Sequence, residues 1–120
     1  IPLIVYSPGN IKPGKSELFA SQIDLMPSLI NLLNLKGNYS SIGKNIFDSK
    51  NGYAVTKEGA LINIFTRHGF MQHSLEQIIK FKPLNDNPDK ILQSRLSAKV
   101  EAYDHLTYKL LTENRWSKPY

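Results

Sequence analysis

Residues 53–73 read YAVTKEGALINIFTRHGFMQH, and this stretch decides the fold of the second half of the chain. It predicts three short strands, because β-branched and aromatic residues are frequent in it and Lys57-Glu58-Gly59 and Arg67-His68-Gly69 supply turn residues. In the middle strand, Ile62 and Ile64 fall on one face, as the period of two requires. The stretch therefore predicts an antiparallel meander, with Gly69 free to adopt a positive φ in the second turn.

Two further elements are expected after the meander. Residues 78–82 alternate between apolar and lysine side chains, which is typical of an edge strand with one wet face. The sequence Asn87-Pro88-Asp89 combines an N-cap residue, proline at the first helical position and an acid in the first turn, so we expect a helix from Pro88 to about Glu113. Its apolar stripe consists of Leu92, Leu96, Val100, Tyr103, Leu106 and Leu110. Residues 49–120 are thus predicted to form an α+β subdomain, with the long helix on one face of the sheet.

Residues 1–48 have a different pattern. Residues 3–6 are apolar in succession, which favours a buried strand covered on both faces, as in parallel or mixed sheets. A helix of about three turns is expected from Asp24, whose side chain would cap the first turn. Its apolar residues cover most of its surface, so we expect the helix to be largely buried; they are Leu25, Met26, Leu29, Ile30, Leu32 and Leu33. A buried strand with nothing before it indicates a fragment of something larger; the alternative is a mature, processed chain.

Composition places limits on function. The chain has 120 residues, of which 41% are hydrophobic and 21% charged, as is ordinary for a globular domain. It contains no cysteine, which excludes thiol catalysis and zinc–thiolate sites. The net charge is +5, but no block of lysine and arginine marks a nucleic-acid arm, so we expect no nucleic-acid partner.

Three residues near the second turn are weak candidates for contact with an anion. Arg67, His68 and His73 lie close in sequence and could bind phosphate, sulfate or a metal. The nearest carboxylate in sequence is Glu76, so this segment has too few oxygen ligands for a hard metal ion. The alternative is that all three are ordinary surface residues of a hairpin.

Other residues with reactive or stacking side chains are better explained structurally. His105 is expected to be exposed on the long helix, and Ser7 follows a strand without a nucleophile motif. The aromatic residues Tyr53, Phe65, Phe70 and Phe81 could form a stacking platform, but their spacing favours core positions. Taken alone, the residues show no catalytic constellation.

Three stretches carry a resemblance to a known family. Residues 1–9 read IPLIVYSPG, residues 21–33 read SQIDLMPSLINLL, and residues 43–47 read GKNIF. Together they resemble the last part of the sulfatase domain in the alkaline phosphatase superfamily, over roughly residues 1–48. The final helix is similar in character to the branch of phosphoglycerol transferases that includes the lipoteichoic acid synthases.

The resemblance implies an α/β, alkaline phosphatase-like parent enzyme that acts on phosphate or sulfate esters of an anionic lipid or sugar. Such enzymes use a divalent metal (Mn, Mg, Ca or Zn) and a Thr, Ser or formylglycine nucleophile, and all these groups precede the first matching strand. No catalytic, cofactor-binding or metal-binding residue therefore maps onto this chain. We expect it to bind no metal and to be inactive alone.

The same resemblance implies a cellular location and binding partners for the chain. The parent would be membrane-anchored on the outer face of the cell envelope, and this chain would be a soluble part of it. Its partner would be the upstream core of the same polypeptide, and the isolated piece could self-associate. The alternative is a free-standing, non-catalytic domain that binds an anionic partner.

Overall fold

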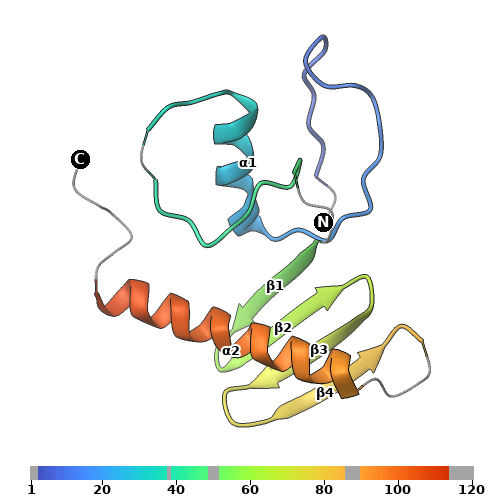
Figure 1. Ribbon diagram of the computed structural model, residues 1–120, viewed down its shortest axis with the longest axis vertical. Coiled ribbons are helices and arrows are strands. Elements are labelled where there is room, and N and C mark those ends of the chain that lie inside the picture. The colour runs from blue at the N-terminus through green and yellow to red at the C-terminus, as the bar shows by residue number, and fades with distance from the viewer. Residues whose placement is uncertain (1–2, 38, 49–51, 86–89, 114–120) are drawn as a thin grey trace.

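The computed structural model describes residues 3–37, 39–48, 52–85 and 90–113. A short 3-10 turn, η1 (Gln22–Asp24), leads into the helix α1 (Leu25–Leu32). Four strands follow, β1 (Tyr53–Glu58), β2 (Leu61–Thr66), β3 (Gly69–Ser74) and β4 (Ile78–Pro83), and then the long helix α2 (Lys90–Thr112). Figure 1 shows α2 lying across the sheet, with α1 and the N-terminal loops at one end.

The predicted meander is confirmed. The four strands form one antiparallel sheet in the order β1-β2-β3-β4. The first turn is shorter than expected, because Lys57 and Glu58 belong to β1 and only Gly59 and Ala60 connect it to β2. Gly59 has a φ of 59°, which a two-residue hairpin turn favours.

The role expected of Gly69 is wrong. Its φ is not positive, and Thr66 pairs with it at the end of the β2–β3 ladder. A Cβ atom at this position would lie 2.7 Å from the carbonyl oxygen of Lys82 on β4. Glycine is needed here because the neighbouring backbone approaches closely, not because of a left-handed conformation.

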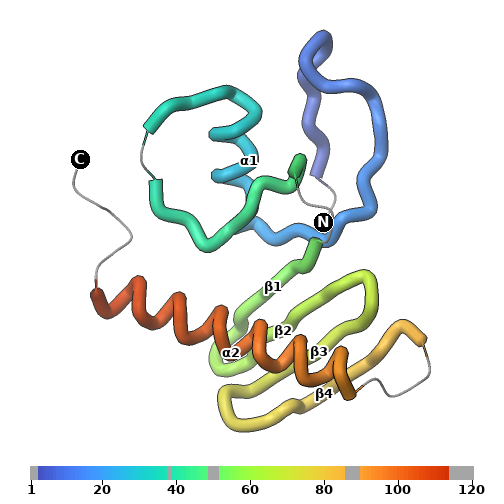
Figure 2. The backbone as a smooth tube through the Cα atoms, in the orientation of Figure 1, coloured from blue at the N-terminus to red at the C-terminus, as the bar shows by residue number. Residues whose placement is uncertain are grey.

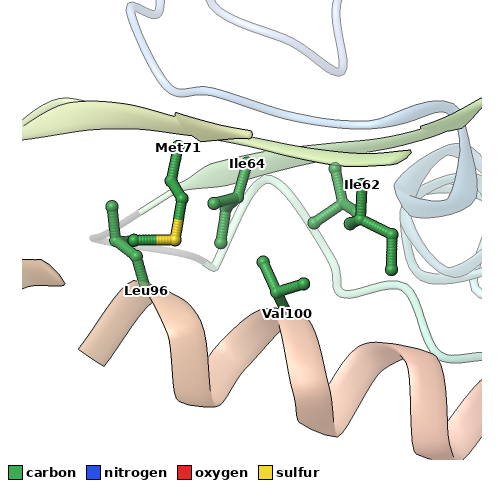
Figure 3. Packing of buried hydrophobic residues seen from close by; sticks show 6 residues of the cluster. Ile62, Ile64, Met71, Leu96 and Val100 are labelled. Atoms are coloured by element: carbon green, nitrogen blue, oxygen red, sulfur yellow. The ribbon is translucent and has the colours of Figure 1, made fainter. Parts of the chain in front are cut away.

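The core lies between the sheet and α2. Ile62, Ile64 and Met71 project from β2 and β3 toward Leu96 and Val100 of α2, as Figure 3 shows. All five side chains are at most 2% exposed. The period-two alternation that predicted the faces of the middle strand is thus confirmed, and each such side chain contributes about 1.5–3 kcal/mol by its burial.

The apolar stripe of α2 is only partly buried. Leu92 and Tyr103 pack against the core beside the two buried residues, whereas Leu106 is 44% exposed. A helix of 23 residues is about 35 Å long, but three spacings between four strands add up to only about 15 Å. The C-terminal turns of α2 therefore extend beyond the sheet, as the tube in Figure 2 also shows. The predicted N-cap at residues 87–89 lies outside the described residues.

The prediction of a buried strand over residues 3–6 is wrong for this structure. These residues belong to no strand, and Leu3, Ile4, Val5 and Tyr6 are 52%, 85%, 36% and 87% exposed. The described residues offer them no strand as a partner, because the sheet consists of β1–β4 alone and the outer edge of β1 is covered differently.

At the middle of that edge, a serine side chain takes the place of a neighbouring strand. The hydroxyl of Ser21 accepts a hydrogen bond from the backbone N–H of Val55 (2.6 Å) and donates one to the carbonyl of the same residue (3.1 Å). It thereby satisfies both backbone groups of Val55, which a neighbouring strand would otherwise pair with. Close by, Gly52 lies against the backbone of Phe19, where any Cβ atom would clash. These contacts fasten the N-terminal half to the sheet.

The predicted helix does begin at Asp24, which occupies the N-cap position of α1, but its predicted capping, length of about three turns and burial are wrong. α1 has eight residues, and the carboxylate of Asp24 makes no capping hydrogen bond to it. Met26, Leu29 and Leu33 are 61%, 44% and 62% exposed. Among the described elements α1 packs only on η1 and not on a strand, so its apolar side chains have no sheet to cover. The buried strand-and-helix core expected for residues 1–48 is therefore not formed within the described chain.

Candidate functional site

The three predicted anion contacts do not converge. Arg67 and His68 are exposed in the turn between β2 and β3. His73 lies at the opposite end of β3, where its side chain is 5% exposed and faces α2. The span of strand from Gly69 to His73 is about 13 Å long at about 3.3 Å per residue, so these side chains form no common site.

His73 instead takes part in a hydrogen-bonded chain that ends at a carboxylate. Its Nε2 lies 3.2 Å from the hydroxyl of Ser97, and that hydroxyl donates to Oε1 of Glu101 at 3.1 Å. Since a serine hydroxyl has one proton and a carboxylate only accepts, Nε2 must carry the imidazole proton and donate it to Ser97. Nδ1 is then an acceptor, and it is buried without a hydrogen-bond partner.

A shallow pocket of about 320 Å³ lies beside this chain, between β3 and α2. Its polar lining comes from His73, Glu101, Asp104, His105 and Tyr108. The order of groups is not that of a nucleophilic triad, because the acid binds the hydroxyl rather than orienting the imidazole. The arrangement ties α2 to β3. Ser97 was not among the predicted site residues, although its place next to the buried Leu96, one helical turn before Glu101, was an available signal.

The described ranges contain no group of three or more histidine, aspartate and glutamate side chains that could hold a metal ion. The residues of this part of the chain thus do not fit the divalent metal that the resemblance implies for the parent.

A second polar cluster lies where the loop before β1 meets α2. The Nζ of Lys44 is 3.6 Å from the centroid of the Tyr53 ring, and the Nζ of Lys99 is 4.6 Å from the same centroid. Both distances are in the range of cation–π interaction. Lys44 also approaches the carbonyl oxygen of Tyr53, at 3.4 Å. Neither lysine was a candidate in the sequence analysis, because the two lie far apart along the chain.

The charges of this cluster influence one another. Partial burial lowers the pKa of the Lys44 ammonium, the carboxylate of Asp24 opposes this shift, and the positive charge of Lys99 adds to it. Burial also raises the pKa of the Tyr53 phenol, and Asp24 and Tyr103 raise it further.

Asp24 positions the cluster. Its side chain is buried at 4% exposure and accepts hydrogen bonds from the backbone N–H groups of Ser21 and Lys44, both at 2.8 Å. The residue expected to cap α1 thus holds two loops together and fixes the backbone of Lys44. The nearby hydroxyl of Ser28 accepts from the N–H of Ile46 and reinforces the same junction.

The four aromatic residues considered as a stacking platform are divided between the two faces of the sheet. Tyr53 and Phe81 pack against the core on the α2 side, as the core interpretation predicted. Phe65 and Phe70 lie on the other face, half-buried, with ring centroids 4.8 Å apart, so the predicted core position is wrong for this pair. A common platform of four rings is therefore not formed.

The structure also places Ser7 and His105, the two remaining residues with reactive side chains. Ser7 accepts a hydrogen bond from the Asn10 side chain within a turn. His105 is exposed, as expected, at the rim of the pocket beside His73.

Within the described residues, no helix combines the length and apolar character needed to cross a membrane.

Comparison with known proteins adds no relative to these observations: no family model, curated protein or solved structure matches the chain.

Proposed function

We propose that this chain is the C-terminal structural portion of a metal-dependent, sulfatase-like enzyme with an alkaline phosphatase-like α/β core. The parent acts on phosphate or sulfate esters of an anionic lipid or sugar, by hydrolysis or by phosphoglycerol or phosphoethanolamine transfer, at the outer face of the cell envelope. Its nucleophile and metal ligands lie in the upstream core. The role of residues 1–120 is to complete and cover that core.

One observation carries this proposal: two apolar segments of the N-terminal half are exposed. Residues 3–6 present four consecutive apolar side chains to solvent. Met26 and Leu29 of α1 and its C-cap residue Leu33 follow at spacings of three and four, so they lie along one face of the helix, and all three are exposed. Exposed apolar groups of this density mark surfaces that pack against other protein. An apolar helix face and an apolar segment that could add to a sheet are what an α/β core would bury.

The contrast with the second half of the chain supports this interpretation. There, Ile62, Ile64 and Met71 are fully buried beneath α2 without help from any other protein. The alternative, a free-standing domain that binds an anionic partner, accounts for this half but leaves the exposed apolar segments unexplained.

The test is the coding sequence before Ile1 and the activity of the protein that it encodes. A Ser/Thr-Asp-His-Gly stretch is expected shortly upstream. The extended protein should hydrolyse a nitrophenyl phosphodiester or nitrophenyl sulfate with Mn, Mg, Ca or Zn and lose this activity with a chelator. Residues 1–120 alone should show none.

Arg67→Gln and His68→Gln serve as controls in the extended protein. Both residues are exposed in a turn, so turnover should be unchanged. A start codon or a signal peptide directly before Ile1, or metal-dependent turnover by residues 1–120 alone, would overturn the proposal.

A further inference from the structure

We propose that Lys44, Lys99 and the Tyr53 ring form a binding site for a phosphate-type oxyanion. The site lies between the loop before β1 and the middle of α2. It depends only on described residues of this chain and is independent of the proposed parent enzyme.

The spacing of the two ammonium groups suits such a ligand. Their distances to the Tyr53 centroid are 3.6 Å and 4.6 Å, so the two Nζ atoms are no farther apart than the sum of these distances. Charge-assisted N–H···O bonds are about 2.8 Å long, and two oxygens of a phosphate are about 2.5 Å apart, so one phosphate bridges up to about 8 Å between two nitrogens. The sum of the two distances lies at the limit of this reach and applies only if the nitrogens lie on opposite sides of the ring; any smaller separation is within reach of one phosphate. Lysine binds phosphate as a point charge and needs no fork-like geometry.

The two ammonium groups have no carboxylate partner in the described chain. The ion pairs there use Lys15, Lys57 and Lys109 instead. Asp24 is the acid whose charge influences the pKa of Lys44, but its two carboxylate oxygens already accept hydrogen bonds from backbone N–H groups. The cluster therefore has a local excess of positive charge.

The site is also held in place before any ligand arrives. The backbone of Lys44 is fixed by Asp24, Tyr53 pairs with Thr66 in the sheet, and Lys99 is adjacent to the fully buried Val100. A ligand would have to order only the ends of two side chains, which lowers the entropic cost of binding. The positive charge of Lys99 lowers the pKa of Lys44, and an anion bound between the two ammonium groups would offset this repulsion.

The test is a titration of the 120-residue chain with inorganic phosphate, followed by amide NMR at constant ionic strength. We expect saturable shifts centred on residues 44, 53 and 99. Lys44→Gln and Lys99→Gln should each weaken the affinity about tenfold, the effect of losing one hydrogen bond to a charged group. The matched control is Lys80→Gln, which removes an exposed lysine from β4 and should leave the affinity unchanged. Lys99→Gln retains a good helix former at an exposed position, so this variant should fold.

Co-sedimentation with lipid vesicles tests whether the oxyanion is a lipid headgroup or a soluble phosphate ester. Co-sedimentation with phosphatidylglycerol vesicles but not with phosphatidylcholine vesicles, lost in Lys44→Gln and Lys99→Gln, would assign the site to a lipid headgroup. Saturable binding of phosphate without co-sedimentation would assign it to a soluble phosphate ester. Shifts that do not saturate, or an affinity that is equal in the wild type and in both site variants, would overturn the proposal.

Discussion

At the scale of single residues, Gly43 lies in close contact with the backbone of a neighbouring segment. A Cβ atom there would collide with the backbone of Ile23 and lie 2.9 Å from the N of Asp24. We expect Gly43→Ala to lower the free energy of unfolding by about 1–3 kcal/mol, the usual cost of overpacking, because backbone atoms cannot rotate away. Gly14→Ala is the matched control, since its nearest neighbour would be 4.0 Å away. Equal midpoints for the two variants in urea denaturation would contradict the close packing of these loops.

The His73–Ser97 hydrogen bond leads to a second prediction at this scale. Ser97→Ala leaves the buried imidazole without its remaining partner and should cost about 1–3 kcal/mol of stability. Ser94→Ala, an exposed position on the same helix, should change stability by no more than about 0.5 kcal/mol. Thermal unfolding of both variants measures the difference. If they unfold alike, His73 does not depend on Ser97.

At the scale of elements, α2 is held to the sheet by few side chains. Leu96 is 2% exposed in the centre of the core, so Leu96→Ala should destabilise the protein by about 2–5 kcal/mol. Leu111, on the same helix, is 66% exposed beyond the sheet, and Leu111→Ala should have an effect within about 0.5 kcal/mol. Since alanine favours helix in both cases, chemical denaturation reports the packing alone. Similar losses for both variants would mean that the C-terminal turns of α2 are packed against other residues as firmly as Leu96 is.

At the scale of the whole molecule, the exposed N-terminal segments predict different behaviour for the chain alone and for the proposed parent. Leu29 is 44% exposed, so in residues 1–120 the substitution Leu29→Ala should cost about 1 kcal/mol, since nearly half of the side chain is still in water. In the extended protein, where the face of α1 would be covered, the cost should rise to about 2–5 kcal/mol. The same modest cost in both proteins would argue against an upstream core on this face.

Hydrogen exchange and light scattering test the same surfaces directly. The amides of residues 3–6 should exchange quickly, whereas those of β2, which are paired on both sides, should be protected. The chain should self-associate, and Met26→Lys with Leu33→Lys should reduce this, while Leu111→Lys at the far end of α2 should not. A monomer in which residues 3–6 are as protected as β2 would favour the free-standing domain.

The sequence by itself determined the elements whose pattern is local. The alternation around Ile62 and Ile64 sets the two faces of the sheet, and the stripe through Leu96 and Val100 sets the buried side of α2, because both periods depend only on neighbouring residues. The meander, its order and its helix cover could therefore be predicted before any contact was known.

Only the tertiary structure decided the rest, and the reason is separation along the chain. Asp24 was expected to cap its own helix, but its carboxylate binds the backbone of Lys44 in a distant loop. Residues 3–6 and α1 have apolar patterns that require a partner, and no pattern reveals that the described chain supplies none. The Lys44–Tyr53–Lys99 cluster joins a loop, a strand and a helix, so it exists only once these elements pack.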